Sequence, residues 1–290
     1  MLSYRRFDKE SDYNIMRHIV QHNCKKSGHL YPQLHIGNLD FERYSFGEIL
    51  NDTTWFVLDG IVEIGFITRQ EDEFFFAIIP EYKHLIQDIL KFIECNCYVH
   101  GATITTEANS KDRLICDALE ERGYIKTSNF RFNGICDLSK IASYPPLLGE
   151  FKIRQTQMKD VARRVELFGL AAGGATTTPE RYIKMMNSPS YCDAMDLVVL
   201  TGDEEIIAYC TIWNDPVSKI AILEPVACVK EYRRKGIMKS TLLYGMNLLK
   251  DSGTKYMYVS TSGPNIASQA LYKSVGFVEH GVNCEWQKKL

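Results

Sequence analysis

The sequence lacks any long hydrophobic run and has almost no net charge. No uninterrupted apolar stretch reaches the roughly 18 residues that would suggest a membrane span. The charged start, residues 1–6, lacks the apolar core of a signal peptide. A formal net charge of -2 gives no electrostatic reason to expect nucleic acid or an anionic membrane as the main partner. We therefore expect a cytoplasmic protein, by default an enzyme.

Cysteine use excludes two further classes of protein. The nine cysteines are scattered through the chain, and Cys95 and Cys97 form the only close pair. Such an odd and dispersed set predicts neither a disulfide framework nor a zinc ribbon.

The histidines do not form a recognisable metal motif. His18 and His22 are four residues apart, with His29 and His35 nearby. However, Ile19 stands where a zinc-protease helix carries its glutamate. We predict no metal site, and the clustering of histidines in the first half is explained more simply by a polar surface.

Composition is that of an ordinary soluble protein. Hydrophobic residues make up 45% of the 290 residues and charged residues 24%. This length is suitable for two domains.

One stretch of the second half reads as a strand, a basic turn and a helix. Residues 219–229 are rich in Ile, Val, Ala and Cys without a helical period, which predicts a buried strand. A single apolar helix face then follows, and Gly253 comes after its expected end. The apolar positions of this face are Met238, Leu242, Met246 and Leu249.

The turn between them is suited to a pyrophosphate. A helix start presents unpaired backbone N–H groups and a fractional positive charge. Gly236 would let the main chain approach the phosphates closely, and three neighbouring cations would add charge. These cations are Arg233, Arg234 and Lys235. The alternative is a helix that merely begins with a solvated basic turn.

A second stretch places Asn265 and Tyr272 on one helix. A predicted strand at residues 256–261 and a turn at residues 262–264 come before Asn265, which is well placed as an N-cap. Tyr272 follows seven residues later on the same face. Asn265 could be only a cap, and Tyr272 only a half-buried aromatic.

Together the two stretches resemble the GNAT family of acyl-CoA-dependent N-acyltransferases. The family turn, Gln/Arg-x-x-Gly-x-Gly/Ala, is matched at Arg233 and Gly236, whereas Met238 occupies a position that is usually small and would crowd that part of the loop. The family's Asn-x₅-Leu-Tyr-x₃-Gly-Phe pattern is matched over residues 265–277. The resemblance implies acetyl-CoA as cofactor, with the pantetheine arm pairing beside Cys228 and Val229. The implied cofactor-binding residues are Cys228, Val229, Arg233, Arg234, Lys235, Gly236, Ile237, Met238, Lys239 and Asn265.

The resemblance also suggests the catalytic groups. In the family, the tyrosine at the position of Tyr272 commonly protonates the departing thiolate, which a neutral phenol can do. Glu224 lies in an apolar strand beside a proline, where burial would raise its pKa toward that of a general base. The alternative for Glu224 is a structural pair with an arginine such as Arg154.

The chain also contains an internal repeat. Residues 79–83 align with 229–233 at an offset of 150, which predicts two GNAT-like units, 1–145 and 146–290, joined near the Pro- and Gly-containing residues 143–149. At equivalent positions the first unit replaces Glu224 by Phe74, Gly236 by Ile86 and Tyr272 by Leu119. We therefore interpret the first unit as degenerate, completing a shared sheet or walling the acceptor pocket.

In the GNAT family an early loop often closes over the acceptor, and here Gly173-Gly174 precedes a helix predicted to start with Thr178 as cap and Pro179 in its first turn. The aromatics Tyr182, Tyr191 and Trp213 could line that pocket, but core positions explain them better.

The sequence thus predicts an α/β fold of two tandem units, each a mixed, mostly antiparallel twisted sheet flanked by helices. The resemblance implies an acetyl-CoA-dependent N-acetyltransferase acting by direct attack of a primary amine of a small molecule, as a monomer or homodimer. The competing hypothesis is a non-catalytic acyl-CoA sensor or partner-binding protein of the same fold. Fold resemblance alone cannot name the acceptor.

Overall fold

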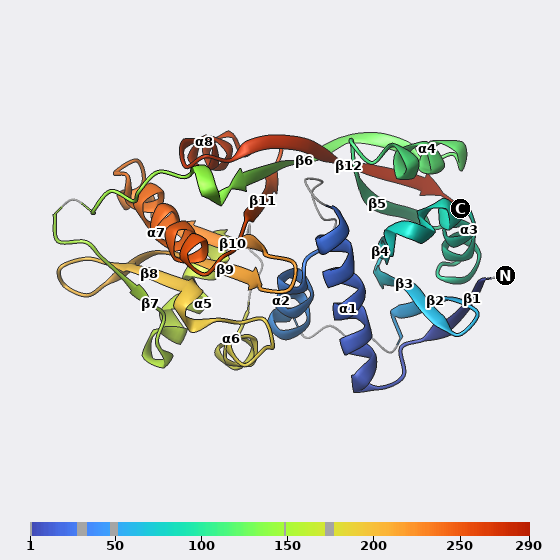
Figure 1. The fold of residues 1–290 in the computed structure, drawn as a ribbon, viewed down its shortest axis with the longest axis horizontal. Coiled ribbons are helices and arrows are strands. Elements are labelled where there is room, and N and C mark those ends of the chain that lie inside the picture. Colours follow the sequence, from blue (N-terminus) through green and yellow to red (C-terminus); the bar gives the residue numbers. More distant parts are fainter. Residues whose placement is uncertain (1, 28–33, 47–51, 148, 172–176) are drawn as a thin grey trace.

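The computed structural model describes residues 2–27, 34–46, 52–147, 149–171 and 177–290. The same succession of elements occurs twice (Figure 1). The first comprises β1 Leu2–Arg6, α1 Glu10–Ser27, α2 Ile36–Phe46, β2 Thr54–Asp59, β3 Val62–Gln70, β4 Glu73–Ile78, α3 Ile86–Asn96, β5 Thr103–Asn109, α4 Arg113–Glu121 and β6 Ile125–Asp137. The second comprises β7 Lys152–Gln155, α5 Val161–Ala171, α6 Pro179–Met186, β8 Asp196–Leu200, β9 Ile206–Asp215, β10 Ile220–Cys228, α7 Ile237–Asp251, β11 Tyr256–Ser262, α8 Ile266–Ser274 and β12 Val278–Lys289.

The predicted elements of the second unit are confirmed. The strand and helix on either side of the basic turn are β10 and α7. Asn265 caps α8 by accepting the Ser268 N–H at 3.1 Å. The Thr178 hydroxyl caps α6, and Pro179 is its first residue. His29, Leu148 and Gly173-Gly174, singled out in the sequence, lie outside the described residues.

The two units share one twelve-stranded sheet of order β1-β2-β3-β4-β5-β12-β6-β11-β10-β9-β8-β7. The final strands are exchanged between the units. The C-terminal strand β12 pairs with β5, for example Asn283 with Asn109, whereas β6 pairs along the length of β11, from Asp137 with Tyr256 to Arg131 with Ser262. The two long strands also pair with each other, which joins the halves along the top of Figure 1. The predicted mixed α/β fold is therefore present, with the last strands crossing over.

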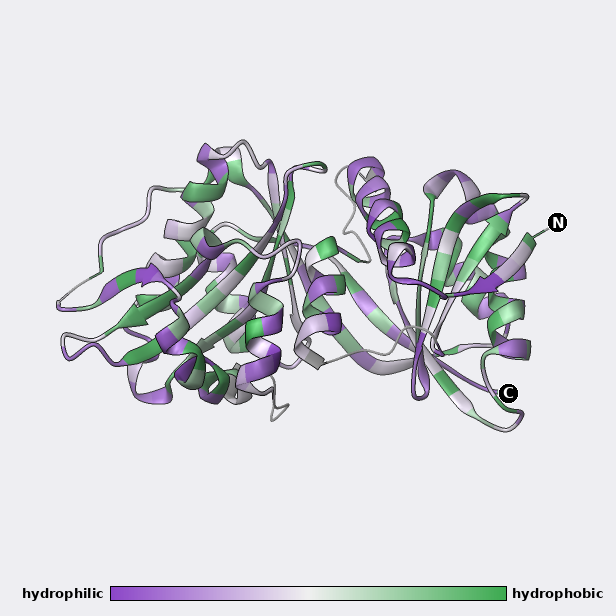
Figure 2. Cartoon of the chain, turned by 90° about the horizontal axis from the view of Figure 1, so that it is seen from below, coloured by the Kyte–Doolittle hydropathy of each residue, from purple (hydrophilic) through white to green (hydrophobic). Residues whose placement is uncertain are grey.

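An apolar core also crosses between the units. It combines α1 and α2 with α5, α6 and the inner face of β9. Phe41 of α2 contacts both Phe168 and Trp213, with ring centroids 6.0 and 6.2 Å apart. A Cβ on Gly37 would lie 2.3 Å from the Trp213 Cβ, so glycine permits the close approach of α2 to the sheet. In Figure 2 the strands are coloured mainly as hydrophobic, while the helices alternate between hydrophobic and hydrophilic residues.

The sheet opens between β10 and β11. These parallel strands pair only from Ile220–Ile222 to Tyr256–Tyr258. Beyond that point β10 continues beside β9, and β11 continues beside β6.

Residues 141–147, in the predicted junction, adopt no regular secondary structure. The boundary at residue 145 stays a prediction, because strand exchange makes the two units structurally dependent on each other. No helix in the described part of the chain is long and apolar enough to cross a bilayer.

Strand exchange predicts which fragments fold. A fragment of residues 146–290 lacks β6, which is the partner of both β11 and β12, so we expect it to be insoluble or to melt without cooperativity. A fragment of residues 124–290 retains β6 and should melt cooperatively, although below the full chain. Thermal melts followed by circular dichroism measure both. Cooperative melting of the shorter fragment at the temperature of the full chain would contradict this arrangement.

Candidate functional site

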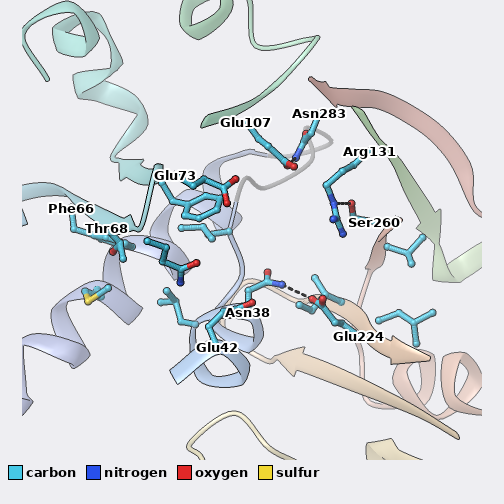
Figure 3. Close-up of a pocket in the computed structure, with 18 residues that line it drawn as sticks. Asn38, Glu42, Phe66, Thr68, Glu73, Glu107, Arg131, Glu224, Ser260 and Asn283 are labelled. Atoms are coloured by element: carbon cyan, nitrogen blue, oxygen red, sulfur yellow. Dashed lines mark hydrogen bonds between the residues drawn. The ribbon is translucent and has the colours of Figure 1, made fainter. Parts of the chain in front are cut away.

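A cavity of about 340 Å³ lies beside the opening between β10 and β11 (Figure 3). Both units line it. The second unit contributes Ile222, Leu223 and Glu224 from β10, Val259 and Ser260 from β11, and Asn283 from β12. The first contributes Met16, Leu34, Asn38, Leu39, Glu42, Phe66, Thr68, Gln70, Glu73, Phe75, Glu107 and Arg131. The expectation that the first unit completes a shared sheet and walls a pocket beside Glu224 agrees with this geometry.

Glu224 lies in the cavity wall where the β9–β10 ladder is irregular, between Leu223 and Val226. The Asn38 side chain donates a hydrogen bond to its carboxylate at 2.9 Å, and Trp213 Nε1 donates to its main-chain oxygen at 2.7 Å. Removal from bulk water raises the pKa of the Glu224 carboxyl, against the opposing effects of Arg131 and Asn38. Its position is that of a candidate base.

The alternative that Glu224 forms a structural pair with Arg154 is wrong. Arg154 forms a salt bridge with Asp160, to which it donates two hydrogen bonds. The equivalent pair in the first unit, Arg5 with Asp12, has the same arrangement. These pairs therefore belong to the repeated framework, and Glu224 is left facing the cavity.

Tyr272 is buried on α8, with its ring packed edge-on against Phe277 at 5.9 Å between centroids. Burial, reinforced by the nearby Glu224 carboxylate, raises the pKa of Tyr272 to about 12, although the Ser268 side chain acts in the opposite direction. The phenol therefore remains protonated at neutral pH and can serve as a proton donor.

The basic turn has the backbone conformation that a phosphate site requires. Gly236 caps α7 with φ 77°, and Arg234 has φ 66°, so two left-handed residues lie just before the helix. Consecutive turns of this kind gather backbone N–H groups into an anion-binding concavity. A Cβ at Gly236 would meet no atom within 4 Å, so the space above this backbone is open.

The first unit lacks this turn. Its 3₁₀ segment Pro80–Leu85 leads directly into α3, and Ile86 has φ -57° in the right-handed region. None of the residues between Ile79 and Ile86 has a positive φ. The degenerate sequence thus corresponds to a different backbone and not only to a bulkier side chain.

The remaining predicted cofactor-binding residues differ in their hydrogen bonds, exposure and orientation. Arg233 Nε donates to the main-chain oxygen of Cys228 at 2.9 Å, and Lys239 is exposed. The N–H of Val229 already donates to Ile207 of β9 at 2.8 Å, so alternation along the strand turns Cys228, and not Val229, toward the open edge. The Asn265 side chain accepts a hydrogen bond from the helix that it caps, which agrees with its prediction as an N-cap.

The burial of four further side chains bears on the other expectations from the sequence. Met238 is buried among apolar core residues beneath α7, which corrects the expectation that its side chain crowds the loop. Tyr182 and Trp213 are buried in the core, as predicted, and Tyr191 is half-buried. The hydroxyls of Tyr182 and Tyr191 both donate to Asp196.

Sequence reasoning missed the acidic wall that the first unit contributes. Glu73 begins β4 and Glu107 lies on β5, and both line the cavity. Burial, with the neighbouring Glu107 and Glu285 carboxylates, raises the pKa of Glu73 to about 7. Burial likewise raises the pKa of Glu107, which accepts a hydrogen bond from Asn283 at 3.3 Å. No local motif marks these residues, because their proximity arises only from the shared sheet.

Comparison with known proteins agrees with this fold. The profile of the "Acetyltransferase (GNAT) family" matches residues 174–277. A tandem GNAT protein from the clavulanic acid biosynthesis pathway superposes with a TM-score of 0.68 at 11% identity, covering 100% of this chain and 98% of the other. A GCN5-related N-acetyltransferase from Sphaerobacter thermophilus gives 0.65 at 15% identity, with 99% and 95% covered. A GNAT-family acetyltransferase from Colwellia psychrerythraea gives 0.65 at 14%, with 99% and 100% covered. No curated protein matches the sequence significantly.

The raised pKa of Glu73 predicts a pH-dependent stability. A carboxyl that binds its proton more tightly in the folded state loses stabilising effect as pH rises from its ordinary pKa of 4.5 through about 7. We expect Glu73→Gln to melt like the wild type near pH 5 and a few degrees higher at pH 8, because solvent screening of this half-exposed group reduces the effect to about 1 kcal/mol. Scanning calorimetry at both pH values measures it. Asp72→Asn, an exposed neighbour, is the control, and an equal shift at both pH values would refute the assignment.

Proposed function

We propose that this chain, whose second half matches the profile of the acetyltransferase (GNAT) family, is an acetyl-CoA-dependent N-acetyltransferase that acetylates a primary amine of a small molecule. The observation that carries the proposal is the carboxyl of Glu224 in the cavity wall where β10 and β11 separate, with the protonated phenol of Tyr272 near enough for its pKa to be raised by that carboxylate. The left-handed turn at Gly236 follows the end of the same strand β10. A cavity of about 340 Å³ beside them has room for a small acceptor.

The residues present suit acetyl-CoA. The open backbone at Gly236 and the N-terminus of α7 would hold the pyrophosphate, with Arg234 and Lys235 adding charge. Beyond its pairing with β11, the edge of β10 would offer the main-chain N–H of Cys228 to the amide-bearing pantetheine arm, while the Cys228 oxygen accepts from Arg233. When bound, this cofactor supplies an acetyl thioester that an amine can attack.

The chain's own side chains would manage the protons. Glu224, through a water, would take a proton from the acceptor ammonium, because burial raises its pKa and so makes it a stronger base than an exposed carboxylate. The free amine would then attack the thioester carbon, so that a C–N bond forms as the C–S bond breaks. Tyr272 would give its proton to the leaving thiolate, and the second proton lost by the attacking nitrogen would restore the phenol through water. The products would be an N-acetyl amine and free coenzyme A, with the proton taken up by Glu224 passing to solvent.

The alternative is a non-catalytic acyl-CoA sensor or partner-binding protein. Such a protein needs the phosphate turn but has no use for a carboxyl and a phenol beside the opening. The Glu224 carboxylate contributes to the raised pKa of Tyr272, so the two side chains are near enough for their charges to interact, which supports the enzyme. We propose that it works in the cytoplasm as a monomer or homodimer, without nucleic acid or membrane.

We expect one acetyl-CoA site for each chain, because only the second unit has the left-handed turn. Titration calorimetry should give a stoichiometry of one, and Gly236→Val should abolish binding, since a left-handed β-branched residue is strained and fills the phosphate space. Gly253→Val is the matched control: it introduces a similar strain at the other end of α7, with φ 85° and open space, and should leave binding intact.

Ile86→Gly should not create a second site, because the backbone there is right-handed. Two equivalent sites in the wild type, or normal binding by Gly236→Val, would overturn the assignment of the cofactor turn.

The pH dependence of turnover separates the two catalytic roles. Tyr272→Phe keeps the ring packing but removes the proton, so we expect turnover to fall by about 10²–10⁴-fold with little change in acetyl-CoA affinity. Glu224→Gln should lose most activity at neutral pH and less at higher pH, where the acceptor arrives deprotonated. A pH–rate profile with any accepted amine tests both. Wild-type turnover of Tyr272→Phe, or an unchanged acidic limb in Glu224→Gln, would reduce that residue to a structural role.

A further inference from the structure

The ionisable lining of the cavity is strongly acidic. Four carboxyls face it against one guanidinium: Glu42, Glu73, Glu107 and Glu224 against Arg131. Figure 3 shows two groups of them on opposite sides of the cavity, Glu224 with Asn38 on one side and Glu73 with Glu107 on the other. The cavity therefore has a second set of carboxyls, Glu73 and Glu107, on the side opposite the proposed base, Glu224.

Arg131 is already used within the protein. Its Nε donates to the Ser260 hydroxyl at 3.0 Å. Its charge also favours the ionised forms of Glu224, Glu107 and Glu73. Since one guanidinium is shared among these carboxylates, it offers little positive potential for an acidic substrate.

The carboxylate of Glu73 is only weakly compensated, by the charge of Arg131. Within the described residues it forms no salt bridge and its side chain accepts no hydrogen bond, although it is half-buried in the cavity wall. The Glu107 and Glu285 carboxylates raise its pKa, which means that these negative charges repel one another. A cation bound between Glu73 and Glu107 would relieve that repulsion and would be held by charge-assisted hydrogen bonds.

The space between the two anionic sides has apolar walls. The first unit supplies Phe66 and Phe75, and the second supplies Ile222 and Val259. Such walls favour a hydrocarbon chain, at about 0.8 kcal/mol for each buried methylene. An α-amino acid would instead bring its own carboxylate into an acidic cavity.

We propose that the acceptor is a small aliphatic diamine or polyamine, with its reacting amine at Glu224 and its second ammonium held by Glu73 and Glu107. This inference rests on the proposed acetyl transfer at the same cavity. The degenerate first unit would then supply the anionic subsite that selects the acceptor.

Acceptors matched in length test the proposal. We expect kcat/KM to be at least tenfold higher for 1,4-diaminobutane than for 1-aminobutane, and lowest for 4-aminobutanoate, which places a carboxylate beside the acidic wall. A series from 1,3-diaminopropane to 1,6-diaminohexane would find the best span. Equal rates for the diamine and the monoamine, or a preference for 4-aminobutanoate, would overturn the proposal.

Variants locate the subsite. Glu73→Gln and Glu107→Gln should each raise KM for 1,4-diaminobutane by about 10–100-fold, which corresponds to the 1.5–3 kcal/mol of a hydrogen bond to a charged group. The preference for the diamine over 1-aminobutane should fall in parallel. Asp72→Asn removes one negative charge from the exposed neighbour of Glu73 and should retain the preference. An undiminished preference in both glutamine variants, each confirmed as folded by circular dichroism, would contradict this subsite.

A binding measurement separates this inference from the proposed reaction. Calorimetry of 1,4-diaminobutane with the full chain, without acetyl-CoA, should show proton release near pH 7, because the bound ammonium lowers the pKa of Glu73. The charged groups facing Glu73 are Glu107 on β5, Glu285 on β12 and Arg131 on β6. Two buffers of different ionisation enthalpy reveal the release, and Glu73→Gln should abolish it.

The outcomes are distinct. Diamine binding with proton release, but no acetylation of any amine, would support the subsite and reject the proposed enzyme. Acetylation of amines without diamine preference or proton release would retain the enzyme and reject the subsite.

Discussion

The exchange of the last strand of each unit is the constraint on which the rest of the structure depends. Because β6 lies between β11 and β12, and β12 lies between β5 and β6, neither half can complete its sheet alone. The same crossing brings Arg131 of β6 and Asn283 of β12 to one cavity wall, beside Glu107 of β5. The cavity is thus a product of the shared sheet and does not belong to either unit.

Within that sheet, the two units have the same succession of helices and strands but differ in backbone conformation just before α3 and α7. Ile79 and Val229, at equivalent positions, have nearly the same conformation, φ -55° with ψ 131° and φ -55° with ψ 138°. Within the next seven residues the backbones diverge, because Arg234 and Gly236 are left-handed whereas the first unit continues through its 3₁₀ segment into α3. The two units therefore differ in backbone conformation, and not only in side chains, at the turn proposed to hold the cofactor.

The local patterns of the sequence predicted the helices and strands around the candidate site well. The apolar period after Ile237, the capping pattern at Asn265 and the glycine-bearing turn each depend on residues close together in the chain, so they could be read directly. By contrast, the partner of Glu224 could not be identified, because Asn38 is 186 positions away and reaches it only through packing between the units. The direction of Cys228 and Val229 also depended on which strand lies on each side of β10.

The sequence by itself determined the repeated α/β plan, the presence of a phosphate-type turn in the second unit only, and the residues Glu224 and Tyr272 as a candidate pair for proton transfer. The turn follows from short-range spacing and the repeat from a constant offset in the chain, whereas the pairing of Glu224 with Tyr272 rests on the resemblance to the GNAT family. The tertiary structure alone decided that the last strands exchange, and that Glu73 and Glu107 of the degenerate unit face Glu224 across one cavity. Long-range strand pairing places these groups together, and no local pattern of residues encodes which distant strand becomes a neighbour.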